Sequence, residues 1–563
     1  MPSLTDPGIH RHHEALEING KTIDDLELET AGYKREMPRQ FSTFSLMGLS
    51  FALTCTWSGT GSSFGIGLME GGPAGVIWSL LPAALMTAVL SAGMAELASA
   101  YPVAGAQYYW SFMVSSEKHR AFAAYLNGWM SVIGWWLGLA SVANFIASMI
   151  LSIAVMWYPD YTIQHYQQWL VYVLITWLAF VVNVFGSRII PFYNKFIMVL
   201  SWIVMIATII TILACSRHQF PTGTWVFGHT LNSTGWKSDG FAFMLCINNA
   251  VYAFLGTDCG AHMCEEIPNP SRNVPKVIMV PIALGLLTAW PFAVACMAGI
   301  SDLDAIMNSA SGVPLIDIFY QGTGGSKAGA TVLITFFAFC FFGCMVATGT
   351  TSSRTLWAVS RDNALPYSHL WAQVHPTWHM PVNAMGLTAT AISIYGLIFL
   401  GSTSVFSSMV GTAIVFLQTS CAIPQAILLF RGRQQVLPPR YFSLGDGWFG
   451  YFINGLSVLW VCYVNIVYCI PSALPVTAEG MNYVSVVFVG LVSFFIGLWF
   501  VSKRDTFKGP RVDYEKMRLR REEALRGVIL EDDGIITTPG TTGEDEITQV
   551  GVQSEKQEGR HYN

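Results

Sequence analysis

Two polar interruptions of apolar sequence carry residue types that could bind a small solute inside a membrane. Residues 57–63 read WSGTGSS and residues 256–260 read GTDCG, each within a long apolar run. A backbone that leaves the helix inside a bilayer is tolerated only where it lines a protein cavity. There its free amides attract anions and its free carbonyl oxygens attract cations. The alternative is close packing of helices through small residues. The candidate solute-binding residues in the two interruptions are Ser58, Gly59, Thr60, Gly61 and Gly256.

Aromatic residues flank both interruptions. Trp57 opens the first, and Tyr252 and Phe254 precede the second. Because Tyr252 lies four residues before Gly256, its ring projects from the same helical face as the interruption. Aromatic faces hold quaternary ammonium groups by cation–π attraction. These three residues are further candidates for solute binding, although 13% of the chain is aromatic and most of its rings must only pack.

Two acidic residues, Asp258 and Glu96, lie well inside apolar segments. A carboxylate at that depth is costly unless it is neutralised or paired, so a functional role is the default interpretation. Since no Lys or Arg falls within these segments, we expect no salt bridge to either carboxylate. Asp258 is therefore expected to be protonated, to be hydrated in a cavity, or to contact a cationic solute. Both acids are candidates for a coupling proton, and Glu96, beside Tyr101 and Pro102, is better suited to a structural hydrogen-bonding role.

Residue spacing indicates no metal, cofactor or enzyme chemistry. His375 and His379 have the i, i+4 spacing of metal-binding helices, but Pro376 and Pro381 argue against a helix there. The 11 cysteines show no zinc-site or CxxC spacing. The chain also has no Gly-x-x-x-x-Gly-Lys-Ser/Thr loop for ATP. We therefore predict no metal, no cofactor and no enzymatic activity.

Composition places these residues in a membrane protein. Of the 563 residues, 53% are hydrophobic and only 12% are charged, about half the roughly 25% typical of a soluble domain. The net charge of −5 is too small to imply an acidic or basic partner. These values exclude an ordinary soluble enzyme, a disordered protein and a nucleic-acid binder.

Twelve segments are apolar enough to span a bilayer, which needs about 20 residues per helix. Of the 30 Lys and Arg residues, only Arg217, Lys237 and Lys327 fall on the side opposite to the N-terminus. The positive-inside rule then places both termini in the cytosol. The predicted spans are 44–68, 74–99, 121–155, 167–186, 191–215, 241–263, 276–300, 328–353, 381–400, 404–429, 449–470 and 482–501.

The two interruptions occupy the first helix of each of two five-helix halves, 44–215 and 241–429. An odd number of helices per half inverts the second half, and paired broken helices in corresponding positions indicate a transporter's binding site. We predict an all-α polytopic membrane protein with twelve transmembrane helices, built as a five-plus-five inverted repeat with helices 1 and 6 broken. The remaining parts are a cytosolic N-terminal tail at 1–43, an outside loop at 216–240, helices 11 and 12 at 449–501, and a cytosolic C-terminal tail at 502–563.

Three motifs resemble those of a known family. Residues 96–108 (ELASAYPVAGAQY), 265–275 (EEIPNPSRNVP) and 360–366 (SRDNALP) resemble the segments after helices two, six and eight of the amino acid–polyamine–organocation superfamily. Within it, residues 255–263 (LGTDCGAHM) and 302–305 (DLDA) resemble the choline permeases of the fungal choline and GABA branch. The resemblance implies the same inverted-repeat fold and uptake of small nitrogenous solutes, usually coupled to protons. It also implies that three tryptophans of helix three lie near the site: Trp129, Trp135 and Trp136.

The predicted function is secondary transport across the plasma membrane by alternating access. The expected partners are a small nitrogenous solute (choline, an amino acid or GABA), a proton and the lipid bilayer, and no nucleic acid. A zwitterion would place its carboxylate on the Ser58–Gly61 amides, whereas choline would need aromatic rings and Asp258. The alternatives are a nutrient sensor that does not transport, and a mover of a pathway metabolite or precursor. The sequon at Asn232 falls in the predicted outside loop, where it could be glycosylated.

Overall fold

The chain folds almost entirely into helices. The computed structural model describes residues 17–18, 21–216, 220–401, 403–477, 481–513, 529–530 and 536–537. Helices satisfy their own backbone hydrogen bonds and can therefore cross a bilayer, so the predicted all-α class is confirmed. The strands among these residues are two antiparallel pairs, β1 (Glu17–Ile18) with β2 (Lys21–Thr22) and β3 (Ile529–Leu530) with β4 (Ile536–Thr537).

Eleven spans of the described residues are long and apolar enough to cross a membrane, and they correspond to the second to twelfth predicted segments. They are α5 (Phe64–Ala100), α7 (Arg120–Trp157), α8 (His165–Phe185), α9 (Ile190–Cys215), α11 (Asp239–Val251) extended by η1 (Tyr252–Phe254) and η2 (Thr257–Glu266), α12 (Pro270–Ala298), α15 (Lys327–Arg361), α17 (Val382–Tyr395) with α18 (Ile398–Gly401), α19 (Thr403–Arg431), α21 (Trp448–Tyr468), and α22 (Val484–Leu498) with η3 (Trp499–Lys503).

The first predicted segment forms two short helices instead of one. α3 (Thr43–Thr54) and α4 (Thr56–Ser62) are separated by Cys55, which adopts the left-handed conformation with a φ of 36°. α4 leads into the first part of α5, which turns at Gly72 (φ 63°) and continues from Pro73. Counted as one broken span, α3 and α4 complete the predicted twelve.

The sixth span is broken between η1 and η2. Leu255 is extended with a ψ of 148°, and Gly256 is left-handed with a φ of 81°. Glycine adopts this conformation without the strain that a Cβ would cause. The second break lies where the sequence predicts it. The first lies at Cys55, just before the predicted interruption at 57–63, and that interruption is itself helical up to Ser62.

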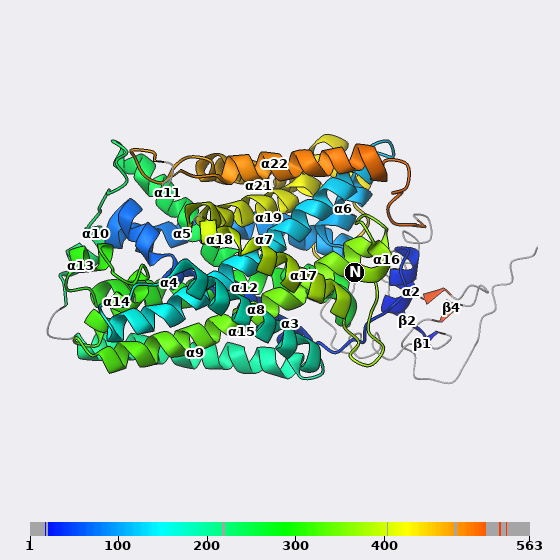
Figure 1. The fold of residues 1–563 in the computed structure, drawn as a ribbon. Helices are drawn as coiled ribbons and strands as arrows, with labels where there is room; N and C mark the ends of the chain where they lie inside the picture. Colours follow the sequence, from blue (N-terminus) through cyan, green and yellow to red (C-terminus); the bar gives the residue numbers. More distant parts are fainter. Residues whose placement is uncertain are drawn as a thin grey trace, which may run out of the picture.

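Packing follows the order of the two halves. The second helices of the halves, α5 and α12, pack on each other, and so do the third helices, α7 and α15. α21 and α22 pack on α19 from outside these ten spans. Figure 1 shows α22 along one edge of the bundle and α9 along the opposite edge. The fold is the predicted five-plus-five arrangement with two added helices.

A short N-terminal helix, α2 (Ile23–Thr30), covers one end of the bundle, which we call the α2 end (Figure 1). Behind it, the Tyr33 hydroxyl donates to Asp362 (2.5 Å), and the Phe41 amide donates to the Glu266 carbonyl (3.2 Å). The segment from 21 to 41 is thus packed against the helices, where the sequence indicated only a polar tail. The opposite end, the α10 end, carries α10 (Gly223–Gly228), α13 (Leu303–Met307) and α14 (Pro314–Gly322).

Three further short helices lie in the connections after α5, α15 and α19. They are α6 (Gln107–Val114), α16 (Ser368–Trp371) and α20 (Arg433–Val436).

Candidate functional site

Trp57 fixes the first break to its neighbours. Its indole nitrogen donates to the Ser201 hydroxyl of α9 (2.7 Å). Its ring meets the rings of Phe292 and Phe337 edge to face, at centroid distances of 5.1 and 4.9 Å. The side chain is fully buried, and its polar atom is already bonded. These contacts favour a packing role for Trp57.

The backbone amides of the first break are occupied in part. The amides of Ser58 and Gly59 both donate to the Cys55 carbonyl at 2.9 Å, so neither is free for an anion. The Thr60 hydroxyl donates to the Thr56 carbonyl (2.8 Å), as hydroxyls do within helices. A solute carboxylate would have to displace these contacts.

The glycines of the first break allow close approach of other elements. A Cβ on Gly59 would lie 3.1 Å from the Ala253 Cα in η1, so the two breaks touch each other here. A Cβ on Gly61 would lie 2.9 Å from the Phe337 ring. These small residues therefore allow close packing, as the alternative interpretation expects. At Gly59 the packing is between the two halves of the fold.

The second break faces α7. The Tyr252 and Ser141 hydroxyls are 3.2 Å apart, and the rings of Tyr252 and Phe145 lie 5.6 Å apart. A Cβ on Gly256 would lie 2.4 Å from Leu53 and 3.1 Å from Trp135, so this glycine is needed for space as well as for its φ. Phe254 is only 1% exposed and packs in the core.

Open space lies beside Gly138 of α7. This glycine is buried, yet a Cβ added to it would meet no atom within 4 Å. Gly138, Ser141 and Phe145 lie on one face of α7 because their spacings are three and four residues. Tyr252 contacts two of them, so its ring and hydroxyl border the same region. Sequence reasoning missed these α7 residues, since a glycine and a serine in a long apolar helix carry no distinctive pattern.

Asp258 is buried and paired. Its Oδ2 accepts a hydrogen bond from Gln107 Nε2 (2.5 Å) and lies 3.2 Å from His262 Nε2. The other ring nitrogen of His262 lies 3.2 Å from the Ala104 carbonyl oxygen. Among the described residues no Lys or Arg forms an ion pair with Asp258. Protonation, hydration or a cationic solute are the partners expected from the sequence, and the histidine four residues further along is a partner that the expectation does not include.

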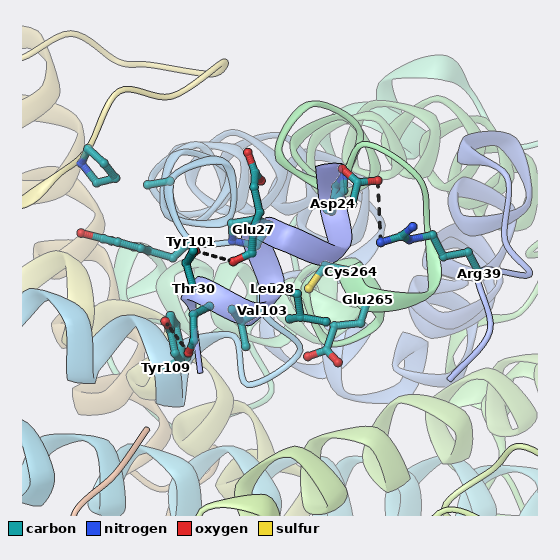
Figure 2. Close-up of a pocket in the computed structure, with 15 residues that line it drawn as sticks. Asp24, Glu27, Leu28, Thr30, Arg39, Tyr101, Val103, Tyr109, Cys264 and Glu265 are labelled. Carbon is teal, nitrogen blue, oxygen red and sulfur yellow. Dashed lines mark hydrogen bonds and ion pairs between the residues drawn. The ribbon is translucent and has the colours of Figure 1, made fainter. Parts of the chain in front are cut away.

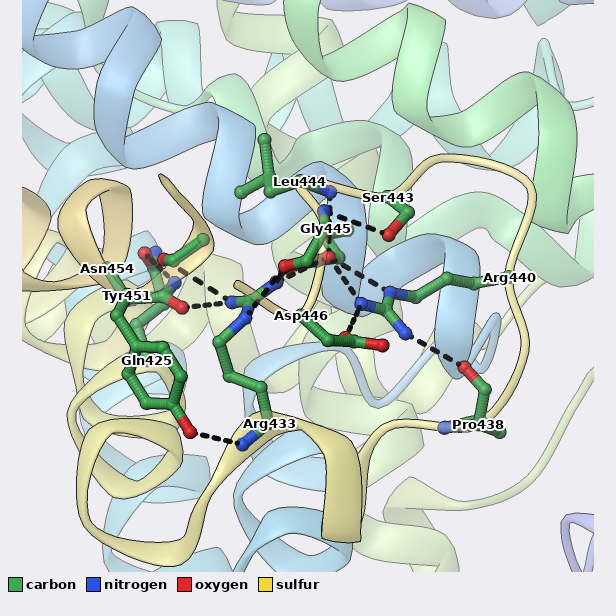
Figure 3. A network of polar contacts seen from close by, with 12 residues as sticks. Gln425, Arg433, Pro438, Arg440, Ser443, Leu444, Gly445, Asp446, Tyr451 and Asn454 are labelled. Carbon is green, nitrogen blue, oxygen red and sulfur yellow. Dashed lines mark hydrogen bonds and ion pairs between the residues drawn. The ribbon is translucent and has the colours of Figure 1, made fainter. Parts of the chain in front are cut away.

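Glu96 accepts hydrogen bonds from two arginines and one backbone amide, and Figure 3 labels these donors, Arg433, Arg440 and Leu444. It accepts from Arg433 Nη2 at 2.6 and 2.5 Å, from Arg440 Nε at 2.9 Å and from the Leu444 amide at 2.9 Å. The expectation that no salt bridge reaches the acids of the membrane segments is therefore wrong for Glu96. Both arginines belong to the connection after α19, and this connection packs against α5 at Glu96. These contacts favour the structural role.

The expectation that no basic residue lies within a helix is also wrong. α15 runs on to Arg361, beyond the predicted end at 353, and so includes two arginines. Arg354 pairs with Glu266 (2.6 Å), and Arg361 pairs with Glu265 (2.7 Å). Both pairs tie α15 to the end of η2.

A third buried acid lies in the gap between the first two predicted segments. Glu70 of α5 is 3% exposed, and its Oε2 has no hydrogen-bond partner among the described residues. The count of two acids within the spans is therefore too low: α5 begins at Phe64 instead of 74 and includes Glu70, and η2 adds Glu265 and Glu266 at its end.

The predicted glycosylation site lies at the α10 end of the chain. The Asn232 amide nitrogen donates to the Trp236 carbonyl (2.8 Å) and to Asp239 (3.0 Å), and Thr234 is buried. Glycosylation at Asn232 stays a prediction, and it would require these two bonds to break.

The sequence model described as "Amino acid permease" matches residues 41–492. The chain belongs to the amino acid permease family. It is therefore a secondary transporter and not an enzyme.

Three similar proteins carry transporter names. A choline transporter of Saccharomyces cerevisiae is 32% identical over 88% of this chain and 87% of its own length. The amino-acid permease BAT1 of Arabidopsis thaliana is 29% identical over 86% of this chain and 96% of its own. A putative amino acid/polyamine transporter of Macrophomina phaseolina is 31% identical over 78% and 97%. Among solved structures, the nucleobase-cation-symport-1 transporter Mhp1 aligns over 87% of this chain and 99% of its own, at 13% identity and a TM-score of 0.47.

Proposed function

We propose that this transporter carries a small organic cation of the choline class across the plasma membrane, coupled to protons, with the α2 end in the cytosol. The solute would lie beside Gly138, between the face of α7 and Tyr252 at the second break. Gly59 and Gly256 would let the two broken helices approach it. Trp57 and Phe254 would pack in the core next to these residues and hold the two breaks in place.

The occupied amides of the first break favour an organic cation over a zwitterion as the solute. A zwitterion would need free amides between Ser58 and Gly61, but those of Ser58 and Gly59 are bound to Cys55. A quaternary ammonium has no carboxylate to place, and it is stabilised by ring faces such as those of Tyr252 and Phe145. Asp258 would supply the negative charge of the region. The relationship to the yeast choline transporter supports the same class.

Uptake competition tests the proposal. Cells that lack their own choline and amino acid permeases would express the chain and take up labelled choline, against an excess of choline, GABA, a basic or a neutral amino acid. We expect choline to compete most strongly. Accumulation blocked only by amino acids would contradict the cation proposal, and signalling without flux would identify a sensor instead.

The orientation is tested by labelling single cysteines at Lys237 and Gln435, two exposed positions near opposite ends of the bundle. The proposal expects the first to react with an impermeant reagent outside the cell and the second to react only after permeabilisation. The reverse pattern would overturn the orientation.

A further inference from the structure

A continuous series of polar contacts joins the second break to the α2 end. It begins at Gln107 and Asp258 and passes to His262. The backbone of Ala104 follows: its carbonyl, in the peptide bond to Gly105, faces His262 (3.2 Å), and its amide, in the peptide bond to Val103, donates to Glu265 (3.1 Å). Arg361 then holds Glu265 with two nitrogens, at 2.7 and 3.0 Å.

The first two ionisable members of this series form a closed pair. The His262 side chain is 0% exposed and that of Asp258 is 3% exposed. The Trp135 ring packs edge to face with the imidazole, and the two ring centroids are 6.0 Å apart. The pair is therefore shielded from water in this state, yet only the backbone of Ala104 lies between it and Glu265.

Glu265 lines a cavity at the α2 end (Figure 2). The cavity lies between the N-terminal helix and the end of η2, and Figure 2 shows Asp24, Glu27 and Glu265 around it. Burial raises the pKa of Asp24 to about 6, against the opposing effect of Arg39. An acid with such a pKa exchanges protons near the pH of a cell interior.

We propose that the Asp258–His262 pair holds the coupling proton and that the cavity lined by Glu265 is where this proton leaves. The proposal rests on the proton coupling of the proposed function. It assigns the proton to His262, with Asp258 as the carboxylate that stabilises the charged imidazolium.

The proton balance of this step is simple. In the state open to the α10 end, an O–H bond of hydronium breaks and its proton forms an N–H bond with neutral His262, leaving water, while the carboxylate of Asp258 keeps its charge. In the state open to the α2 end, the same N–H bond breaks and the proton passes to water in the cavity. Histidine suits this exchange because it changes charge most readily between about pH 5 and 8.

The basic group of this series is Arg361, which is already paired with Glu265. The ionisable groups near the pair are the thiol of Cys259 on its own element, the thiol of Cys421 on α19, and Glu265 beyond the backbone of Ala104. α6 contributes the amide of Gln107, α7 the indole of Trp135, and α5 the Ser91 hydroxyl, which is 3.1 Å from that of Thr257. A static structural hydrogen bond is the alternative role of the pair.

Infrared spectroscopy of the purified full-length chain tests the assignment without any solute. Difference spectra between pH 5 and 8 should contain imidazole bands that disappear in His262→Gln. The matched control His369→Gln removes an exposed histidine of α16 and should retain them. If the bands of His262 do not change over this range, the proposal is overturned even when the protein transports normally.

A second variant covers the case in which His262→Gln fails to fold. Gln107→Met removes the amide that donates to Asp258 while keeping a side chain of similar length. Loss of this donor favours the protonated pair, so the midpoints of the infrared titration and of the pH profile of uptake should both move to higher pH. Unchanged midpoints contradict the proposal. If the wild-type protein moves none of the tested solutes but His262 titrates, the proposed solute is wrong and the proton site stands.

Discussion

Two buried carboxylates of this transporter have opposite surroundings. Glu96 receives four hydrogen bonds from two arginines and a backbone amide. Asp258 has one neutral amide and one imidazole. Both side chains are almost completely buried, so burial alone does not separate a structural acid from a functional one. The difference lies in the fixed positive charge: Glu96 has two permanent cations beside it, and Asp258 has a partner that can gain or lose one.

The break geometry that positions Asp258 should be the most sensitive feature. Gly256→Val places a β-branched residue at a φ of 81° and drives its Cβ within 2.4 Å of Leu53. Left-handed backbone alone costs about 1–2 kcal/mol for a residue with a Cβ. We expect uptake to fall below detection while the protein still reaches the cell surface, as measured by surface labelling. Gly490→Val, at an exposed glycine of α22 with open space around it, is the control. Near-normal uptake by Gly256→Val would show that the break is not part of the site.

Neutralising the saturated carboxylate should affect folding. Glu96→Gln leaves Arg433 buried without its anion, and breaking a buried pair from one side costs about 3–5 kcal/mol. We expect a large fall in the unfolding temperature in detergent and little folded protein at the surface. Asp258→Asn should unfold close to the wild-type temperature, because no permanent cation is stranded. Equal destabilisation by both variants would remove the distinction between the two acids.

The effect of Asp258→Asn on transport separates the solute classes. If a fixed cation contacts the carboxylate, KM should rise at least about tenfold, since truncating one partner of a buried charge pair costs 2–5 kcal/mol. If the solute is a zwitterion, KM should stay near the wild-type value; with either solute the pH dependence of concentrative uptake should flatten, because the charged His262 loses its carboxylate. Uptake measured against solute concentration at several pH values distinguishes these results. A variant with unchanged KM, rate and pH profile would assign Asp258 a purely structural role.

The smallest expected effect concerns Asp24, an acid of the N-terminal helix. Its pKa is raised to about 6 from 3.8, mainly by burial, so docking of α2 favours the protonated form. Docking should weaken as pH rises from about 4 to about 6, where only the undocked form ionises, and change little above 6, where both forms are ionised. Hydrogen exchange of residues 23–30, corrected for intrinsic rates, should show this trend in the wild type and a weaker one in Asp24→Asn. An opposite trend would mean that the ion pair with Arg39 outweighs burial.

The spans and the second break could be predicted from the sequence because they depend on local composition, whereas the first break lies at Cys55, two residues before the predicted interruption. Twenty apolar residues and a polar glycine-containing interruption are visible within a short window. The partners of Glu96 were not predictable in this way, since Arg433 lies 337 residues away and reaches it only through the fold of the connection after α19. His262 was within reach of sequence reasoning: its i, i+4 spacing from Asp258 is a recognisable pairing, and only Lys and Arg had been considered as partners. The space beside Gly138 depends on packing and leaves no signal in the sequence.

The contacts of the N-terminal segment make it a reporter of the transport cycle. Tyr33 donates to Asp362 after α15, the Phe41 amide donates to Glu266 at the end of η2, and Asp24 accepts from the Asn269 amide before α12. Two of these attachment points lie where η2 connects to α12, and the third follows α15, so we expect a movement of α15 against η2 to loosen the segment. An antibody fragment or a fluorophore directed at residues 23–30 would therefore count open and closed molecules directly, and a bulky tag fused close to residue 21 would shift the balance that it is meant to observe.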